Sequence, residues 1–319
     1  MKAVYLRQGR VSVEELPPPQ RLPGFALIRM LRAGICNTDL ELQRGYYGFE
    51  GIPGHEFIGE VLASDAREFV GRRVAGEINL SCGRCNYCAI GLGRHCQNRS
   101  VLGIVKHPGA FAELLTLPDR NLHLIPSGIS DEEAVFVEPL AAACEILDQV
   151  VLPPGEAVAV LGDGKLGLLI AQVLHAHGSP VTVFGHHAGK LAIVAARGIA
   201  VSTSDEYPRG HFPFVVECTG SAAGLNNAIQ MVQPRGTIIM KSTVHEKVTM
   251  DTAPVIVNEI SLVGSRCGRF EPAIQLLQDR KIDIRPMLSG EFPLEQAPAA
   301  FAEAARKGVL KVILRNASA

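Results

Sequence analysis

The sequence predicts an α/β protein in which a mainly β amino-terminal part precedes a parallel, doubly wound sheet. Up to about residue 126 the chain reads as short strands broken by glycine and proline, among them 25–33, 57–63 and 111–117. From residue 157 onward, short apolar runs alternate with helical segments, a pattern typical of βαβ units. We therefore expect two regions of different architecture.

The elements of the second region follow from the same patterns. The run AVAVL at 157–161 suits a strand buried on both faces, and a helix to residue 177 follows it. The other expected elements are helices at about 139–150 and 189–197, strands at 181–184, 214–217, 237–240 and 261–264, two helical segments after residue 264, and a closing strand at 311–314.

Length and composition limit the classes of function. A chain of 319 residues suggests about two domains. With 47% hydrophobic residues, 20% charged residues and a net charge of −1, it has no basic excess for a nucleic-acid or membrane-surface partner. The amino terminus lacks the apolar core of a signal peptide, and the most apolar helical stretch, 165–177, is shorter than the roughly 20 residues that span a bilayer. We therefore expect a cytoplasmic protein.

A loop with the sequence LSCGRCNYCAIGLGRHC holds four of the eight cysteines, spaced C-x2-C-x2-C-x7-C. In a reducing cytoplasm such clusters are more often metal ligands than disulfides. Four thiolates can surround Zn²⁺ tetrahedrally, and a site closed in this way is structural. A redox pair would need only two of these cysteines, whereas an iron–sulfur cluster could also use four. The prediction is a structural metal site, with zinc favoured over the alternatives. Its ligands are Cys82, Cys85, Cys88 and Cys96.

The sequence GDGKLG, between the strand at 157–161 and the following helix, has the G-x-G-x-x-G spacing of a dinucleotide-binding loop. The first glycine permits the tight turn, the second lets the backbone approach a pyrophosphate, and the third lets the helix pack on the strand. An ordinary strand–turn–helix is the less favoured alternative. The expected cofactor contacts in this loop are Gly162, Gly164, Lys165, Leu166 and Gly167.

The next strand ends without the acid that usually binds the ribose hydroxyls of NAD. Gly185 stands at that position, followed by His186, His187 and Lys190. A carboxylate there would repel a 2′-phosphate, whereas a glycine with nearby donors leaves room for one. These residues therefore favour NADP over NAD, although the histidines could also be plain solvated loop residues.

Three further segments carry chemically reactive side chains. They are AGICNTDLEL with Cys36, GIPGHEFIGEV with His55 and Glu56, and FVEPLAAACE with Glu138. Taken singly, a lone Cys or His is usually a structural side chain and an exposed Glu is usually solvated. Together with the four-cysteine loop and GDGKLG, in this order, they resemble the zinc-dependent medium-chain alcohol dehydrogenase family over nearly the whole chain.

The resemblance implies a specific architecture. Residues 1–141 and 265–319 would form a GroES-like, mainly β catalytic domain that includes the structural zinc lobe. Residues 142–264 would form a Rossmann domain, the doubly wound parallel sheet that binds the cofactor. Relatives of this family are commonly homodimers or homotetramers, so we expect one of these states.

The resemblance also implies a catalytic zinc site. Cys36 and His55 would be ligands. Glu138 stands where the best-known alcohol dehydrogenases have a cysteine; a glutamate there resembles the polyol, glucose and threonine dehydrogenase branches, and it would bind the metal directly or through water. Glu56 is a second carboxylate that can reach or leave the metal, and Asp39 would orient His55. Two rival ligands on the helix of Glu138, Cys144 and Glu145, do not occupy the motif position. About two zinc ions per chain are then expected, one catalytic and one structural.

Other residues are weaker candidates. Thr38 occupies the family's proton-relay position, and Glu41 stands where some relatives have a relay histidine; Glu41 could equally be an exposed carboxylate. Thr219 follows the strand at 214–217 and should pass near the cofactor. Arg266 and Lys311 could reach cofactor phosphates or be plain surface charges.

The predicted function is a zinc-dependent, NADP- or NAD-linked dehydrogenase that acts on a secondary alcohol, polyol or sugar, or on the matching carbonyl. The zinc would polarise the substrate oxygen while hydride passes to or from the nicotinamide. A protein that binds zinc and cofactor without turnover, as a sensor or structural protein, is the alternative. A zinc hydrolase is disfavoured because it would leave the dinucleotide loop unexplained.

Overall fold

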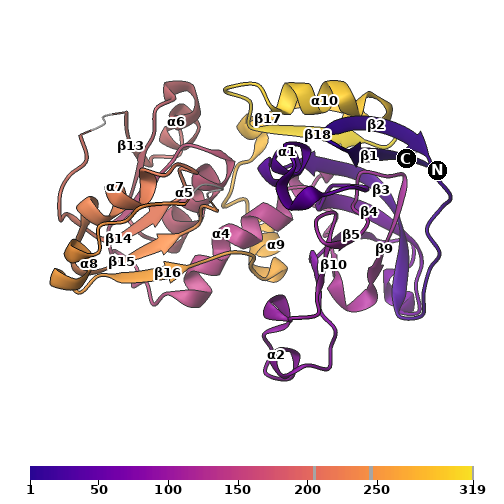
Figure 1. Cartoon of the computed structure of the whole chain (residues 1–319), viewed down its shortest axis with the longest axis horizontal. Helices are drawn as coiled ribbons and strands as arrows, with labels where there is room; N and C mark the ends of the chain where they lie inside the picture. Colours follow the sequence, from indigo (N-terminus) through magenta and orange to yellow (C-terminus); the bar gives the residue numbers. More distant parts are fainter. Residues whose placement is uncertain (204–205, 244–246, 318–319) are drawn as a thin grey trace. The chain divides into compact units, whose positions relative to one another are not determined.

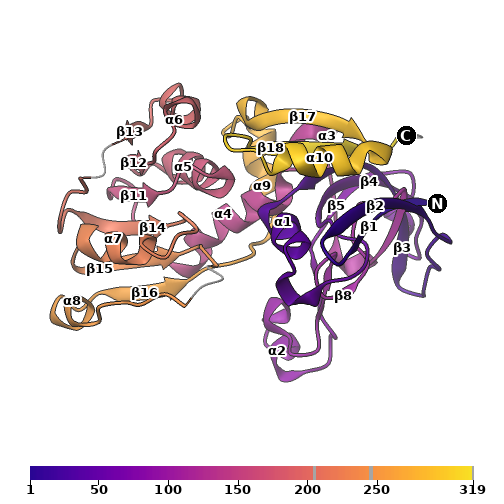
Figure 2. The ribbon, with the colours of Figure 1, turned by 45° about the horizontal axis from the view of Figure 1, so that its top comes forward.

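The structure is a computed structural model of the whole chain, shown in Figure 1 and, turned by 45°, in Figure 2. It describes residues 1–203, 206–243 and 247–317. The chain folds into two compact units. Unit 1 comprises Met1–Glu138, Phe270–Gln278 and Ile284–Ala319, and unit 2 comprises Pro139–Arg269 and Asp279–Asp283.

Unit 1 is mostly β structure. Its strands are β1 (Lys2–Arg7), β2 (Arg10–Glu15), β3 (Phe25–Ile35), β4 (Glu56–Ala63), β5 (Arg73–Gly76), β6 (Asn79–Leu80), β7 (Ser100–Leu102), β8 (Lys106–His107), β9 (Leu114–Pro118), β10 (Leu122–Leu124), β17 (Leu288–Pro293) and β18 (Lys311–Arg315). Seven of them form one sheet in the order β10-β5-β4-β3-β18-β17, with β9 also paired to β3. Its neighbouring strands are antiparallel except β17 and β18, which run parallel.

Short helices complete unit 1. They are α1 (Asn37–Gln43), α2 (Asn86–Ala89), α3 (Asp131–Ala134), α9 (Phe270–Gln278) and α10 (Ala297–Ala304), with 3-10 turns η1 (Tyr46–Gly48), η2 (Arg67–Phe69), η3 (Gly93–His95), η4 (Asp119–Asn121), η5 (Arg285–Met287) and η6 (Leu294–Gln296). α10 packs beside β17 and β18, as both views show. Its Ala300 and Phe301 are buried there, as expected for the apolar face of a surface helix.

Strand β3 is the centre of the large sheet, because it pairs with β4, β9 and β18. Its side chains alternate between buried and half-buried positions from Phe25 to Met30. In the antiparallel register Gly34 pairs with Glu56, and Ile35 pairs with Val312 of β18. The end of β3 therefore lies beside the beginnings of β4 and β18.

Unit 2 is a parallel α/β structure. Its strands are β11 (Val158–Leu161), β12 (Val181–Phe184), β13 (Ala200–Ser202), β14 (Phe212–Glu217), β15 (Val232–Met240) and β16 (Ser261–Gly264). Its helices are α5 (Lys165–His177), α6 (Ala188–Ala195), α7 (Gly224–Met231) and α8 (Ala253–Val257). Helix α4 (Val137–Gln149) starts at the end of unit 1. All adjacent strands pair in parallel, in the order β13-β12-β11-β14-β15-β16. This is the doubly wound order with its switch point between β11 and β14. The loops after these strands thus share one edge of the sheet.

The fold class predicted from the sequence is confirmed. Every expected strand of the second region is present, and AVAVL contains β11, whose four residues are all buried. The differences are at element ends: the expected helix 189–197 is α6, from Ala188 to Ala195, and the expected strand 111–117 is β9, from Leu114. The amino terminus forms the hairpin β1–β2, turning at Gln8 and Gly9, which both have positive φ. Among the described residues, no helix has the length and apolar character needed to cross a membrane.

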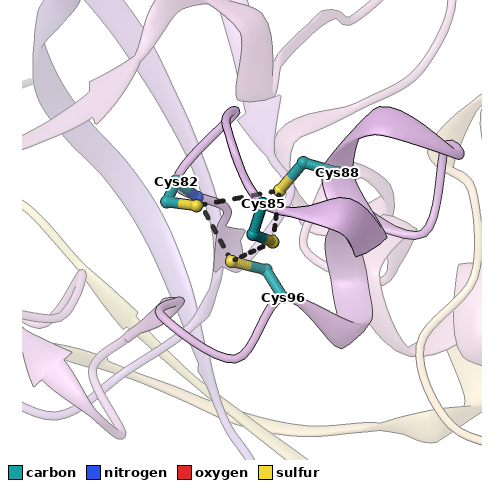
Figure 3. Close-up of side chains that lie close together, drawn as sticks. All are labelled: Cys82, Cys85, Cys88 and Cys96. Atoms are coloured by element: carbon teal, nitrogen blue, oxygen red, sulfur yellow. Dashed lines mark hydrogen bonds between the residues drawn. The ribbon is translucent and has the colours of Figure 1, made fainter.

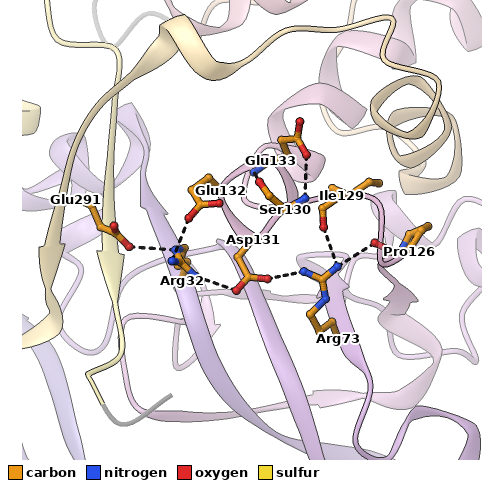
Figure 4. A network of polar contacts seen from close by, with 9 residues as sticks. All are labelled: Arg32, Arg73, Pro126, Ile129, Ser130, Asp131, Glu132, Glu133 and Glu291. Atoms are coloured by element: carbon orange, nitrogen blue, oxygen red, sulfur yellow. Dashed lines mark hydrogen bonds and ion pairs between the residues drawn. The ribbon is translucent and has the colours of Figure 1, made fainter.

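An ion-pair network anchors the segment before α4 to the large sheet (Figure 4). Asp131, the first residue of α3, accepts hydrogen bonds from Arg32 Nη1 (2.8 Å) and Arg73 Nη1 (2.6 Å). Arg73 also donates to the carbonyls of Pro126 (2.9 Å) and Ile129 (2.7 Å). One carboxylate therefore joins β3 and β5 to the loop that enters α3.

The same corner is closed by helix capping and by a contact to β17. Ser130 Oγ accepts from the Glu133 N–H, and the Glu133 carboxylate accepts from the Ser130 N–H, which is a capping box. Arg32 Nε also donates to Glu291 Oε1 at 3.0 Å. These contacts fix the start of α3, and through it the approach to Glu138 in the first turn of α4.

The network makes a stability prediction. Asp131→Ala should lower the free energy of unfolding by about 1–3 kcal/mol, because two guanidinium groups lose a charged acceptor. The three side chains are 22–28% exposed, so partial screening places the value toward the lower end. Urea unfolding followed by far-UV circular dichroism measures it, since the chain has no tryptophan. The matched control is Glu291→Ala, which removes a partner of Arg32 that is more exposed than Asp131. It should lower the free energy of unfolding by less than about 1 kcal/mol. Equal losses in the two variants would contradict the anchoring role of Asp131.

Candidate functional site

Three potential metal ligands meet where β3 ends and β4 begins. Cys36 directly follows β3, and His55 and Glu56 stand at the start of β4. One ligand atom from each of these residues lies within 4.8 Å of the others. The antiparallel pairing of the two strands explains this proximity, although His55 lies 19 positions after Cys36 in the sequence. Sulfur, imidazole nitrogen and carboxylate oxygen are all donors that zinc accepts.

Asp39 holds the two ligand segments together. It is fully buried in the first turn of α1, and its Oδ2 accepts the backbone N–H of Cys36 at 2.8 Å. Its Oδ1 accepts the backbone N–H of Gly54 at 3.1 Å. Gly54 has φ +98°, and a Cβ there would lie 2.4 Å from the Phe111 ring, so this turn requires glycine. Besides its expected role in orienting His55, Asp39 therefore also positions the backbone of both ligand segments.

The imidazole of His55 is oriented toward Asp39. Its Nδ1 lies 3.5 Å from Asp39 Oδ1, outside hydrogen-bond geometry, and has no other hydrogen-bond partner among the described residues. Burial lowers the pKa of His55, but the charge on Asp39 and the contact with Cys36 outweigh it, so the pKa lies well above its usual value. The surroundings thus favour a positive charge at this ring, whether a proton or a metal ion. With Nδ1 facing the carboxylate, Nε2 is the nitrogen left for a metal.

A buried ion pair borders the same cluster. Lys311 Nζ donates to Glu56 Oε2, and both side chains are 1% exposed. Burial lowers the pKa of Lys311, but the charges of Glu56 and Cys36 outweigh it and raise the pKa. The ammonium also lies 5.5 Å from the centroid of the Phe136 ring. Of the two alternatives expected for Lys311, the plain surface charge is therefore wrong.

The ion pair needs a glycine beside it. A Cβ on Gly34 would lie 2.8 Å from Glu56 Oε2, 3.1 Å from Lys311 Cδ and 2.7 Å from Val135 Cγ1. The pairing of Gly34 with Glu56 in the β3–β4 register explains the close approach. Sequence reasoning missed this role of Gly34. In the sequence, Gly34 is only a glycine two residues before Cys36. Nothing in that stretch indicates that β18 lies beside it.

The other expected residues of this site are placed as follows. Thr38 Oγ1 lies 3.8 Å from Cys36 Sγ, within reach of the cluster. Glu41 pairs with Arg44 on the exposed side of α1. Glu138 is half-buried in the first turn of α4 and is not a member of the 4.8 Å cluster found among the described residues. The two rival ligands, Cys144 and Glu145, are also outside that cluster, and burial raises the pKa of Cys144 to about 12.

The four cysteines of the loop converge on one point (Figure 3). Sulfur–sulfur distances are 3.5 Å for Cys85–Cys88, 3.6 Å for Cys85–Cys96 and 4.0 Å for Cys82–Cys88. These are too long for disulfides, and all four thiols are free. Four sulfurs arranged tetrahedrally around zinc at about 2.3 Å would be about 3.8 Å apart. The loop therefore fits a closed four-cysteine metal site.

The backbone of this loop favours thiolates. The N–H of Arg84 lowers the pKa of Cys82 to about 6, with a further contribution from Cys96. The N–H of Cys88 likewise lowers the pKa of Cys85. For Cys96 the N–H of Cys82 lowers the pKa, but burial and the hydrogen bonds with the Cys82 and Cys85 thiols outweigh it and raise the pKa to about 11. Since thiolate is the form that binds metal, the loop favours the binding form at Cys82 and Cys85.

The dinucleotide loop has the form that a phosphate needs. Gly162 has φ +119°, and a Cβ on Gly167 would lie 2.1 Å from the Gly162 oxygen, so the first and third glycines are required by the turn and by the packing of α5. A Cβ on Gly164 would meet nothing within 4 Å, which leaves open space in front of the loop. Gly164 also caps α5 without a side-chain hydrogen bond. The first turn of α5 thus begins directly behind the loop, and the N–H groups at the start of a helix are a common binding site for an anion.

The loop after β12 lies beside the glycine loop. The Gly162 N–H donates to the Phe184 oxygen, and Gly185 and His187 contact Asp163. His186 is exposed, whereas Lys190 is half-buried in the first turn of α6. The structure therefore brings the expected cofactor residues of these two loops together. Sequence reasoning missed Asp163, because the x positions of G-x-G-x-x-G carry no fixed residue type.

Two further loops share this edge of the sheet. Glu217, 4% exposed at the end of β14, accepts hydrogen bonds from Thr219 N–H (2.8 Å) and Thr219 Oγ1 (2.6 Å) and so shapes the loop that exposes Thr219. After β15, Lys241 donates to the carbonyls of Ala142 and Arg266. Arg266 itself is exposed.

The Glu56–Lys311 pair can be tested by stability. Lys311→Met should lower the free energy of unfolding by about 3–5 kcal/mol, because it leaves a buried carboxylate without its partner. Adding Glu56→Gln should restore much of that loss. The matched control is Lys2→Met, which breaks an exposed pair with Glu295 and should cost less than about 1 kcal/mol. Urea unfolding of the four proteins gives the values. If Lys311→Met lowers the free energy of unfolding no more than Lys2→Met does, the Glu56–Lys311 pair does not stabilise this site.

Comparison with known proteins agrees with this geometry. Residues 22–127 match the family model "Alcohol dehydrogenase GroES-like domain", and residues 166–279 match "Zinc-binding dehydrogenase". The first match covers the Cys36–His55 region and the four-cysteine loop, and the second covers most of unit 2.

Individual relatives extend over almost the whole chain. D-altritol 5-dehydrogenase of Agrobacterium fabrum is 34% identical over 92% of each chain, and sorbitol dehydrogenase of Halalkalibacterium halodurans is 29% identical over 98% of this chain and 99% of its own. A solved zinc-binding dehydrogenase from Sinorhizobium meliloti 1021, bound to NADP, is 28% identical, covers 98% of each chain and superposes with a TM-score of 0.89. The chain therefore belongs to the zinc-dependent medium-chain dehydrogenase family.

Proposed function

We propose that the protein is a zinc-dependent dehydrogenase that transfers hydride between a secondary alcohol, polyol or sugar, or the matching carbonyl, and a nicotinamide cofactor. The observation that carries this proposal is the Cys36–His55–Glu56 cluster, together with an open dinucleotide loop in the same chain. Two of the relatives named above, sorbitol dehydrogenase and D-altritol 5-dehydrogenase, are named for sugar alcohols, which supports a polyhydroxylated substrate.

Residues of unit 1 would have separate roles at the metal site. Zinc bound there would act as a Lewis acid on the substrate oxygen. Cys36 and His55 would be its constant ligands, Glu138 a further ligand directly or through water, and Glu56 a carboxylate shared with Lys311. Asp39 holds the backbone of the ligand segments in place. Because Lys311 partly neutralises Glu56, the pair limits the negative charge that the site presents to an alkoxide.

Proton transfer from the substrate hydroxyl is assigned to Thr38. Its Oγ1 both accepts and donates, and it lies beside the sulfur of Cys36. Glu41, three residues further along the chain, would be the next carrier. Because the Glu41 side chain is 42% exposed, bulk water would be the proton acceptor at that end.

The cofactor is assigned to unit 2. The N–H groups at the start of α5 would bind the pyrophosphate, with Gly162, Gly164, Lys165, Leu166 and Gly167 forming the loop. When bound, the nicotinamide accepts or supplies the hydride. We assign NADP in preference to NAD because Gly185 replaces the ribose-binding acid and His186, His187 and Lys190 follow it. Thr219 and Arg266 are further proposed contacts. The NADP-bound relative supports the choice.

The metal content and assembly complete the proposal. The two clusters, with ligand sets of different chemistry, support about two zinc ions per chain, one catalytic and one structural. A homodimer or homotetramer is the proposed assembly. The competing function is a zinc- and cofactor-binding sensor or structural protein without turnover; the open, mixed-ligand cluster favours the enzyme, since a structural zinc site is usually closed.

A substrate panel tests the proposed reaction. The zinc-loaded protein should oxidise some secondary alcohols among polyols and sugars, and reduce the matching ketones, with NADP(H) giving the higher kcat/KM. The assay follows absorbance of the reduced cofactor at the same substrate concentrations with NADP and NAD. Tight cofactor binding without turnover of any substrate would favour the sensor function, and a strong NAD preference would overturn the assignment of Gly185.

Metal analysis tests the two sites separately. The purified protein should contain about two zinc ions per chain, and Cys36→Ser about one, because the two sites bind independently. Cys96→Ser should also lose about one zinc ion, and its melting temperature should fall because the loop loses its closed metal site. Cys144→Ser, which changes a buried thiol outside both clusters, is the control and should keep about two. An unchanged zinc content in Cys36→Ser would contradict the catalytic site.

A further inference from the structure

Lys241, which directly follows β15, is a buried lysine with three oxygen partners. It is 9% exposed. Its Nζ lies 2.6 Å from the Ala142 carbonyl oxygen, 2.9 Å from Ser265 Oγ and 3.0 Å from the Arg266 carbonyl oxygen. An ammonium group has three N–H donors and no acceptor. These three contacts therefore use every donor of the Lys241 side chain.

The partners of Lys241 come from different segments of unit 2. Ala142 lies in α4, whereas Ser265 and Arg266 directly follow β16. The backbone N–H of Lys241 also donates to the carbonyl of Glu217, the last residue of β14, at 2.8 Å. One residue thus ties the ends of three neighbouring strands to a helix.

α4 and the segment after β16 also meet elsewhere. A Cβ on Gly268 would lie 1.9 Å from the Ala141 oxygen, so the two backbones are in direct contact there. Arg269 pairs with Asp148 at 2.9 and 3.0 Å, but these side chains are 53% and 38% exposed. Exposed ion pairs contribute little to a fixed geometry. Of the two polar links, the buried one at Lys241 is therefore the stronger constraint on this segment.

These strand ends lie on one side of the switch point between β11 and β14. In the order β13-β12-β11-β14-β15-β16, the strand β12 lies on the other side. A doubly wound sheet binds one half of a dinucleotide on each side, outside the carboxyl ends of its strands. The loop after β12 belongs to the adenosine half. The ends of β14, β15 and β16 are then left for the nicotinamide half.

We propose that Lys241 is a positioning residue for the nicotinamide half of the cofactor. Its ammonium group holds the carbonyl of Arg266 and the hydroxyl of Ser265 against α4, and so fixes the loop after β16 before the cofactor binds. The proposal rests on the proposed function in that it takes Arg266 to be a cofactor contact. It is independent of the choice between NADP and NAD.

A direct contact between Lys241 and a cofactor phosphate is less consistent with the structure. A lysine that binds a phosphate must direct at least one N–H at the ligand. Here each N–H faces an oxygen of the protein, and the side chain is buried. Lys241 therefore acts through the loop that it holds rather than on the cofactor.

The physical effect is preorganisation. A loop that is already ordered loses less conformational freedom when a ligand binds. Without the ammonium group, the carbonyls of Ala142 and Arg266 would lose a charged donor, and the cofactor would have to order the loop. The loss should appear in the affinity gained from the nicotinamide half. The adenosine half, on the other side of the switch point, should bind as before.

Binding of the whole cofactor and of its adenosine fragment to the zinc-loaded protein tests this role. Isothermal titration calorimetry with NADPH and with 2′,5′-ADP gives the ratio of the two affinities. Lys241→Met, which removes the donors and keeps a long side chain, should lower this ratio about 10-fold, with 2′,5′-ADP affinity changed less than about 2-fold. NADH and 5′-ADP replace the two probes if the wild type prefers NAD.

Two further variants control the experiment. Arg269→Ala breaks the exposed pair between α4 and the same segment, and it should leave the affinity ratio unchanged. Ser265→Ala removes one partner of the ammonium group and should lower the ratio about 3-fold. Because Ser265→Ala leaves Lys241 in place, it remains informative if Lys241→Met disturbs folding.

A double-mutant cycle distinguishes positioning from a general structural role. If Lys241 acts through Arg266, Lys241→Met should lower the ratio much less in the Arg266→Ala background than in the wild type. Fully additive effects of the two substitutions would overturn the proposal. Equal loss of NADPH and 2′,5′-ADP affinity in both Lys241→Met and Ser265→Ala, or an unchanged ratio in both, would also overturn it.

The outcomes separate the proposal from the proposed function. A ratio that depends on Lys241, without turnover of any substrate, would sustain the positioning role and reject the enzyme. Turnover with a ratio that is indifferent to Lys241→Met would sustain the enzyme and reject the positioning role. A wild type that binds 2′,5′-ADP as tightly as NADPH would also reject the positioning role, because the nicotinamide half would then contribute no affinity.

Discussion

The site of unit 1 depends on the Asp39 carboxylate at the point where β3 turns into α1. It is fully buried and accepts backbone N–H groups from Cys36 and Gly54, the residues at the edges of the two ligand-bearing segments. The sheet register alone brings β3 beside β4, but it does not fix the loops beyond the strand ends. Asp39 does so, and the same oxygen that binds Gly54 faces His55. One carboxylate thus holds the backbone of the proposed metal site and faces the ring of His55.

Both units use buried charge in the same way. In unit 1, Lys311 pairs with Glu56 in a space that only glycine at position 34 allows. In unit 2, Asp163 pairs with His187 in a space that only glycine at position 185 allows. In each case a charged side chain from one segment occupies the volume that a Cβ on a neighbouring strand would fill. The Glu56–Lys311 pair is buried on both sides and is therefore costly to break, whereas the side chain of His187 is 34% exposed.

The sequence was sufficient for the features that depend on local pattern. Alternating strands and helices predicted the parallel sheet, GDGKLG predicted the turn before α5, and cysteine spacing predicted a cluster that the structure closes to sulfur distances of 3.5–4.0 Å. The sequence was insufficient for contacts that depend on the pairing of strands far apart in the chain. The burial of Lys311 follows from β18 lying next to β3, some 280 residues apart in sequence terms, and no local pattern encodes that pairing. Asp163 was missed for a related reason: its role appears only when two loops of a parallel sheet meet.

The central claim is that one chain carries an open, mixed-ligand metal site and a separate closed four-cysteine site. A crystal structure of the zinc-loaded protein with anomalous differences at the zinc absorption edge tests it most directly. The account predicts one peak bonded to Cys36 and His55 and a second within about 2.3 Å of the four cysteine sulfurs. A single peak in the cysteine loop, with Cys36 and His55 free of metal, would contradict it.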